Sequence, residues 1–174
     1  IPYVLLRETP LYSAAFRQSA FILINAVNLT LLILERRPVK LTPDQLRLHT
    51  LVFRMLTPRE LLKFMSIAKW TKADPGDMIV KKGEHMDSLL LVFEGNANVV
   101  VEDSTVANLK AGGFIGEMSY MLGGATSADV VAGENLRYLA WDRSDLSYFF
   151  QKNPALEKVL NVILGKDMAL KLTK

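Results

Sequence analysis

The chain has 174 residues, of which 50% are hydrophobic and 22% charged, with 10 glycines, 7 prolines and no cysteine. These proportions exclude disordered, collagen-like and disulfide-stapled proteins, and the lack of cysteine excludes thiolate zinc sites, iron–sulfur clusters and thiol nucleophiles. The net charge of +3 falls short of the basic surface of a dedicated nucleic-acid binder, which leaves anionic lipid or a phosphate ligand as anionic partners. Because the chain begins with Ile1 and ends at Lys174 inside a helical pattern, we expect a fragment of a longer protein.

Residues 1–35 form an apolar N-terminal segment. No charged residue occurs from Gln18 to Leu34, a stretch close to the roughly 20 apolar residues that cross a bilayer. A basic cluster follows at Arg36, Arg37 and Lys40, and such a cluster predicts that this side of the membrane is cytoplasmic. We expect a membrane helix here, and the alternative is a long helix buried in an oligomer interface.

Residues 36–70 are predicted to form linker helices. Thr42-Pro43-Asp44 is typical of a helix start, and apolar residues continue to Leu56. Thr57-Pro58-Arg59-Glu60 has the spacing of a capping box with proline at the first helical position, so a second helix is expected through about Trp70.

Residues 71–174 are predicted to form a β-roll with C-terminal helices. Turn signals recur at intervals typical of a barrel or jelly roll, and they separate six expected strands, at residues 78–82, 88–94, 97–102, 105–109, 129–132 and 136–141. Asp142 is expected to cap a short helix, and Pro154 to start a last helix with an apolar face. The expected fold class is therefore mainly β with flanking helices (α+β), a jelly roll preceded by an apolar helix.

Five glycines carry the first family resemblance, at positions 76, 83, 95, 113 and 116. With Glu117 directly after the last of them, they resemble the glycine framework of cyclic-nucleotide-binding domains. The residues from Phe114 to Ser119 stand where that family has its phosphate-binding cassette. The resemblance implies an eight-stranded jelly roll, a short helix inside the cassette and C-terminal helices that close over the ligand.

A second resemblance covers more of the chain. The apolar stretch that ends in Arg-Arg-Pro-Val-Lys, together with the segments 53–56, 139–143 and 164–167, is similar to the Popeye-domain proteins. Those are membrane proteins with a cytoplasmic domain of the cyclic-nucleotide-binding type, so the resemblance implies a membrane location with residues 36–174 on the cytoplasmic side. Their cassette has an altered sequence, whereas Gly116-Glu117-Met118-Ser119 keeps the ordinary form.

The chemistry of a cyclic nucleotide indicates what each cassette residue can do. Its ribose hydroxyl needs an acceptor, its phosphodiester needs donors, and its base needs an apolar wall. Glu117 is the expected acceptor, Gly116 allows close approach of the backbone, and a short helix from about Glu117 to Leu122 would turn N–H groups toward the phosphate. The predicted ligand-binding residues are Phe114, Ile115, Gly116, Glu117, Met118, Ser119, Thr126, Ser127 and Ala128. On the alternative interpretation, Gly116 is a turn, Glu117 an internal ion pair and the hydroxyls are caps.

One position departs from the family. Thr126 stands where typical binders have an arginine that forks onto the phosphate. Loss of that arginine is expected to weaken binding about 10- to 150-fold unless another cation substitutes, and Lys110 and Arg137 are the candidates. Popeye-type proteins also lack this arginine and are regarded as cyclic-AMP binders, so a cyclic nucleotide is still the expected ligand.

No catalytic or metal-binding set is found in the sequence. His49 and His85 stand far apart and outside metal-ligand spacing, and no nucleophile–base pair can be assembled, so neither an enzyme, a metal nor a cofactor is expected. The leading hypothesis is a membrane-tethered regulatory module that binds cyclic AMP and acts through its C-terminal helices, within a homo- or hetero-oligomer. The alternatives are a degenerate roll for oligomerisation or scaffolding, and a transcription factor of the catabolite-activator kind.

Overall fold

The computed structural model describes residues 11–35 and 39–172, and it divides between Val39 and Lys40 into two units. The first unit contains α1 (Leu11–Glu35), whose apolar side chains, such as Phe21 and Ile24, are exposed. Its segment Phe16–Ile33 is long and apolar enough to cross a membrane, and none of it is buried.

The polar side chains within α1 bond back to the helix itself. Asn25 Nδ2 donates to the carbonyl of Phe21 over 2.8 Å, and Thr30 Oγ1 donates to that of Ala26 over 2.7 Å. Polar groups that are satisfied inside a helix cost less in a hydrocarbon environment than free ones. Asn25 and Thr30 are therefore compatible with the expected membrane helix.

Two short helices begin the second unit, both at a capping box. α2 (Pro43–Leu51) starts at Thr42 with Gln45 as the reciprocal partner, and α3 (Pro58–Met65) starts at Thr57 with the predicted Glu60. The prediction that the second helix reaches Trp70 is wrong, because residues Lys69–Lys72 form a strand instead. That strand is held by pairing with a distant segment, which the local sequence does not show.

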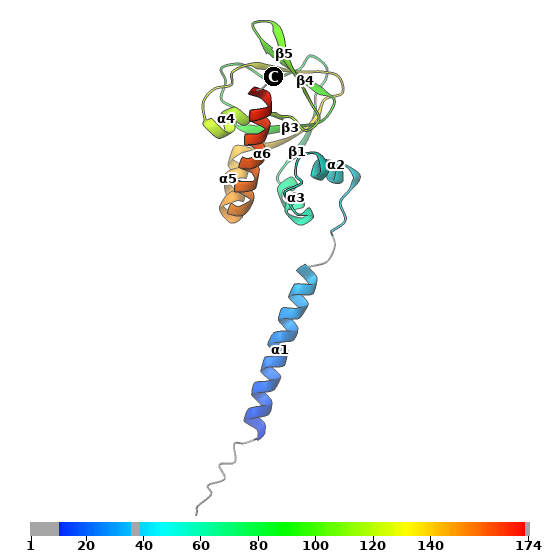
Figure 1. Ribbon diagram of the computed structural model, residues 1–174, viewed down its shortest axis with the longest axis vertical. Helices are drawn as coiled ribbons and strands as arrows, with labels where there is room; N and C mark the ends of the chain where they lie inside the picture. The colour runs from blue at the N-terminus through cyan, green and yellow to red at the C-terminus, as the bar shows by residue number, and fades with distance from the viewer. Residues whose placement is uncertain (1–10, 36–38, 173–174) are drawn as a thin grey trace, which may run out of the picture. The chain divides into compact units, whose positions relative to one another are not determined.

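The β-roll consists of two four-stranded antiparallel sheets in the described part of the chain (Figure 1). One sheet has the order β1-β8-β3-β6 and the other β2-β7-β4-β5. The strands are β1 (Lys69–Lys72), β2 (Met78–Val80), β3 (Ser88–Glu94), β4 (Asn96–Val101), β5 (Ser104–Lys110), β6 (Phe114–Ile115), β7 (Asp129–Ala132) and β8 (Arg137–Asp142). The expected jelly roll with flanking helices is confirmed, and β1 and β6 are the two strands that the sequence did not indicate.

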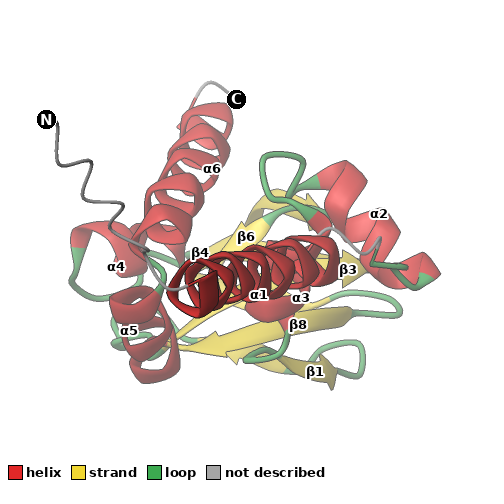
Figure 2. Cartoon of the chain, turned by 90° about the horizontal axis from the view of Figure 1, so that it is seen from below, coloured by secondary structure: helices red, strands yellow, loops and turns green. Residues whose placement is uncertain are grey.

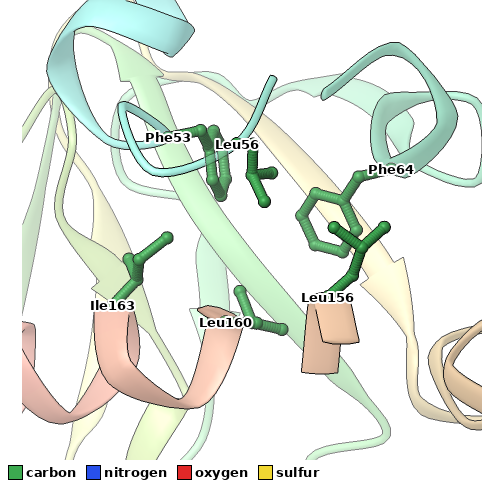
Figure 3. Close-up of a pocket in the computed structure, with 6 residues that line it drawn as sticks. All are labelled: Phe53, Leu56, Phe64, Leu156, Leu160 and Ile163. Carbon is green, nitrogen blue, oxygen red and sulfur yellow. The ribbon is translucent and has the colours of Figure 1, made fainter. Parts of the chain in front are cut away.

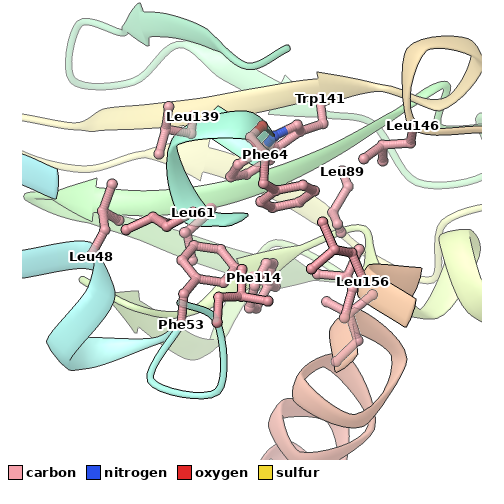
Figure 4. Packing of buried hydrophobic residues seen from close by; sticks show 14 of the residues in the cluster. Leu48, Phe53, Leu61, Phe64, Leu89, Phe114, Leu139, Trp141, Leu146 and Leu156 are labelled. Atoms are coloured by element: carbon pink, nitrogen blue, oxygen red, sulfur yellow. Dashed lines mark hydrogen bonds between the residues drawn. The ribbon is translucent and has the colours of Figure 1, made fainter. Parts of the chain in front are cut away.

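The sheet that carries β1 packs against the helices of the second unit (Figure 2). Trp141, Phe53, Phe64 and Phe114 are fully or nearly fully buried there, with the Phe53 ring 6.3 Å from the indole of Trp141 between centroids (Figure 4). Phe53 and Phe64 come from the segment expected to be a linker. The two short helices therefore share one hydrophobic core with the roll.

Two helices end the chain, α5 (Arg143–Lys152) and α6 (Pro154–Leu172), and they lie side by side (Figure 1). The predicted apolar face of α6 is buried at Leu156, Leu160 and Leu164. A gap of about 10 Å³ lies between this face and Phe53, Leu56 and Phe64 (Figure 3). It is about the size of one water molecule and is lined by apolar side chains, so it is a packing defect and no ligand site.

The start of α5 differs from the prediction. Asp142 occupies the N-cap position, but its side chain makes no capping hydrogen bond. Its carboxylate instead forms an ion pair with Lys69 and accepts a 3.1 Å hydrogen bond from Ser88 Oγ. Asp142 therefore links β8 to β1 and β3, because both strands flank it in the sheet.

Candidate functional site

The cassette is built as a strand, a sharp turn and a short helix. β6 is followed by Gly116 with φ +83°, and α4 (Glu117–Leu122) has the bounds expected from the sequence. Glycine is needed at this turn for two reasons. A left-handed backbone strains other residues, and a Cβ at Gly116 would lie 2.3 Å from Met86 Sδ.

A cavity of about 850 Å³ opens beside the cassette. This volume is in the range of small-molecule sites. Strand residues Val80, Val99 and Val130 supply part of an apolar wall, and Leu170 of α6 adds to it. All nine predicted ligand-binding residues line this cavity: Phe114, Ile115, Gly116, Glu117, Met118, Ser119, Thr126, Ser127 and Ala128. The fold thus brings them to one place, and their contact with a ligand stays a prediction.

Glu117 is a charged side chain that the fold buries, with 5% of its surface exposed. Its Oε1 lies 2.7 Å from Nζ of Lys171, near the end of α6. A carboxylate removed from water needs such a partner, because an isolated buried charge is costly. Glu117 is therefore both the expected hydroxyl acceptor and, in this structure, half of an internal ion pair.

The hydroxyls of the cassette make structural hydrogen bonds. Thr126 Oγ1 donates to the carbonyl of Lys81 over 2.6 Å and lies 3.2 Å from that of Glu84. Ser119 Oγ donates to the carbonyl of Gly124 over 2.7 Å. These bonds hold the loop after α4 in place, as the structural interpretation of the hydroxyls anticipated.

The two cations proposed from the sequence lie in different places. Lys110 lines the cavity. Arg137 does not, because its guanidinium stacks on Trp70 at 4.3 Å and on Phe93 at 5.0 Å and pairs with Asp44 at 3.1 Å. Arg137 is thus committed to fastening α2 to the sheet and cannot replace the missing arginine.

A third cation, Lys171, was missed by the sequence analysis. Its Nζ lies 2.7 Å from Glu117 Oε1, 2.7 Å from Asp167 Oδ2 and 2.6 Å from the carbonyl oxygen of Phe114. The contact with Asp167 is an ion pair without hydrogen-bond geometry, and that buried oxygen has no donor in the described part of the chain. The spacing of Asp167 and Lys171 on one helix predicts their pairing, but nothing local indicates that this end of α6 reaches the cassette.

Arg143 anchors the far end of the cassette helix. Its Nη2 donates to the carbonyl of Ser119 over 2.9 Å and lies 3.3 Å from that of Tyr120, and its guanidinium lies 5.0 Å above the Tyr120 ring. Burial raises the pKa of Tyr120, so its phenol stays neutral at physiological pH. Arg143 therefore connects α5 to α4.

No group of three or more potential metal-ligating side chains is present among the residues described. His49 Nε2 lies 2.8 Å from the carbonyl of Leu56, which is a structural contact. Among the residues described, the charged side chains that line the cavity are Lys110, Glu117, Asp167 and Lys171.

The family comparison agrees with this geometry. Residues 70–153 match the family model described as "Cyclic nucleotide-binding domain". The family resemblance is confirmed. A crystal structure of a cyclic nucleotide-binding domain from Methylobacillus flagellatus KT superimposes with a TM-score of 0.64 at 24% identity, over 68% of this chain and 69% of that one.

Curated relatives extend the similarity toward the N-terminus. Popeye domain-containing protein 1 of Rattus norvegicus is 26% identical over 164 residues, or 88% of this chain and 46% of the relative. The cGMP-dependent protein kinase of Plasmodium berghei (strain Anka) is 30% identical over 114 residues, or 66% of this chain and 12% of the kinase. The chain thus spans about half the length of the Popeye relative that it resembles.

Proposed function

We propose that this protein is a membrane-tethered regulatory module that binds a cyclic nucleotide, cyclic AMP, and transmits binding through its C-terminal helices. The observation that carries the proposal is the position of Glu117. Its buried carboxylate faces a cavity of about 850 Å³ whose lining includes the whole predicted cassette and part of α6.

The cavity offers each group of the ligand a partner. Glu117 accepts from the ribose hydroxyl, and the phosphodiester lies along the turn at Gly116, which has no side chain of its own. The base contacts the apolar wall that includes Val80, Val130 and Leu170. The resemblance to Popeye-domain proteins, which are regarded as cyclic-AMP binders, favours cyclic AMP as the ligand. The similarity to a cGMP-dependent kinase makes cyclic GMP the competitor to test.

Transmission follows from the contact between α6 and the cassette. Lys171 joins the end of α6 to Glu117, the residue that the ribose hydroxyl engages. A ligand that competes for Glu117 favours a different pose of α6, and it shifts the equilibrium by as much as it prefers that pose. Partners that contact α5 or α6 would sense the change.

Membrane tethering rests on α1. Its segment Phe16–Ile33 has the length and composition of a membrane span. The basic residues that follow in the sequence, Arg36, Arg37 and Lys40, favour a cytoplasmic β-roll. Tethering is tested by extracting membranes that carry the chain with alkaline carbonate. The chain should stay in the membrane fraction, and release into the supernatant would contradict a spanning helix.

Calorimetry on the full chain in detergent micelles tests ligand binding. We expect heat with cyclic AMP, weaker binding of cyclic GMP, and affinity about 10- to 150-fold lower in Glu117→Gln, since a hydrogen bond to a charged acceptor is lost. Glu134→Gln, at an exposed carboxylate on the β7–β8 loop, is the matched control and should bind as the wild type does. Absence of heat at millimolar nucleotide, or equal binding by both variants, would contradict the proposal.

A second candidate function is a non-binding roll that serves oligomerisation or scaffolding at the membrane. The hydrogen bonds of Thr126 favour this second candidate. Thr126 stands where typical binders have the arginine that contacts the phosphate, and its hydroxyl instead holds the backbone of the neighbouring loop. This candidate predicts no calorimetric response and a chain that elutes as an oligomer in detergent.

A further inference from the structure

The cavity lining includes two carboxylates, which disfavour an anionic ligand unless a lysine offsets their charge. Within the described residues the charged side chains of the lining are Lys110, Glu117, Asp167 and Lys171. The two carboxylates meet at Lys171 Nζ, each 2.7 Å away. A phosphodiester that enters beside Glu117 is repelled by both carboxylates, since like charges in a partly dry site interact strongly. A cation must therefore accompany the phosphate.

Lys171 is better placed for this role than Lys110. Its side chain is 30% exposed and its ammonium is already held by three oxygens, whereas Lys110 lies at the end of β5 with its side chain exposed. An ordered cation loses less conformational freedom on binding than a free one does. Thr126, at the usual position of the phosphate cation, offers no charge.

We propose that Lys171 is the phosphate-recognising cation of this site, supplied by α6 instead of by the cassette. The inference rests on the proposed function and assigns a residue to it. In the absence of nucleotide, Lys171 is the counter-ion of Glu117. With nucleotide bound, Glu117 accepts from the ribose hydroxyl and Lys171 pairs with a phosphodiester oxygen.

When nucleotide binds, Glu117 and Lys171 each exchange one partner for another, so neither group is left without a contact. An ammonium has three donors, and in this structure Lys171 donates to Glu117 and to the carbonyl of Phe114, while Asp167 Oδ2 lies 2.7 Å away as an ion pair. Turning one donor from Glu117 to the phosphate requires a side-chain movement at Lys171, while Asp167 on the same helix continues to hold the ammonium. The site therefore selects a ligand that presents an anion next to a hydroxyl.

Calorimetry of the full chain in micelles with cyclic AMP and with adenosine, which lacks the phosphate, tests the assignment. Wild type should bind cyclic AMP at least 10-fold more tightly than adenosine. Lys171→Met should bind cyclic AMP about 10- to 100-fold more weakly than wild type, because a charge-assisted contact is lost. Its affinity for adenosine should stay within about twofold. Lys171→Arg keeps the charge and should restore most of the affinity for cyclic AMP.

Two matched variants separate this role from a general charge effect. Lys166→Met removes an exposed charge from the same helix, and Lys110→Met removes the other cavity lysine. Lys166→Met should bind cyclic AMP within about threefold of wild type, and Lys110→Met should lose less affinity than Lys171→Met does. Equal or tighter binding by Lys171→Met, or an equal loss in Lys166→Met, would overturn the assignment while leaving the proposed function intact.

The wild-type comparison keeps the test independent of how Lys171→Met folds. If wild type binds adenosine as tightly as cyclic AMP, no cation recognises the phosphate and the assignment is wrong. If wild type binds neither ligand nor cyclic GMP, the proposed function itself fails.

Discussion

The indole Nε1 of Trp141 donates a 3.0 Å hydrogen bond to the carbonyl oxygen of Phe64, whose ring stacks on the same indole with 4.8 Å between centroids. Both side chains are buried. One residue pair thus fastens α3 to β8 by a polar and an apolar contact at once.

Replacing Trp141 by phenylalanine should destabilise the roll substantially. The change removes the donor of a buried hydrogen bond and leaves a cavity, so we expect the free energy of unfolding to fall by about 2–4 kcal/mol. Urea unfolding followed by circular dichroism measures it. Trp70→Phe, at an indole that is 41% exposed and stacks on Arg137, should cost about 1 kcal/mol or less. Equal losses would show that the buried pair is unimportant.

Alanine at Gly116 should be costly for two separable reasons. The positive φ strains any side chain, and the new Cβ meets Met86 Sδ at 2.3 Å. We expect a loss of about 2–3 kcal/mol in unfolding free energy. Gly83→Ala, at φ +84° with open space around it, should lose only the strain, about 1–2 kcal/mol. In a Met86→Ala background, Gly116→Ala should cost less stability than it does in the wild type, because only the backbone strain remains, and an unchanged cost would contradict the close contact.

Removing the guanidinium of Arg143 should loosen the cassette helix. Arg143→Met deprives the carbonyls of Ser119 and Tyr120 of their donor, so amide hydrogen exchange in residues 116–124 should accelerate while the core strand β3 stays protected. Affinity for nucleotide should fall together with this protection. Lys158→Met, at an exposed position of α6, should change neither, and an unchanged exchange pattern in Arg143→Met would refute the anchoring role.

The pair between Lys69 and Asp142 should make a small, pH-dependent contribution to stability. The hydrogen bond from Lys69 lowers the pKa of Asp142 below its ordinary 3.8, and the same bond raises the pKa of Lys69 above 10.5. Folding is therefore favoured by Asp142 at pH values above about 4, and that contribution is lost as pH falls through the lowered pKa. Lys69 contributes below pH 10.5 and loses its contribution above it.

Asp142→Asn tests this dependence. Its urea midpoint should lie slightly below that of wild type between pH 5 and pH 9, and the difference should shrink below about pH 4. The effect is small because both side chains are exposed to solvent. A difference that persists unchanged at the acid end would show that the charge of Asp142 is irrelevant.

Local signals predicted most of the elements with good accuracy. The strands Ser88–Glu94 and Asp129–Ala132 and the short helix Glu117–Leu122 have the bounds expected from the sequence. Each is delimited by glycine, turn residues or a capping position, and these act through neighbouring residues. The two missed strands, Lys69–Lys72 and Phe114–Ile115, are too short to show a pattern of their own and exist because β8 and β3 pair with them.

For the site, the sequence by itself determined the cassette: a glycine that must be left-handed, the carboxylate after it, and the absence of an arginine at Thr126. Only the tertiary structure decided which cation lies in the cavity. Arg137 stacks on Trp70 and pairs with Asp44, whereas Lys171, 54 residues after Glu117, pairs with the Glu117 carboxylate. The physical reason is the distance along the chain over which the interactions act. Turns and caps depend on adjacent residues, whereas an ion pair between α4 and α6 depends on how the apolar face of α6 packs against the roll.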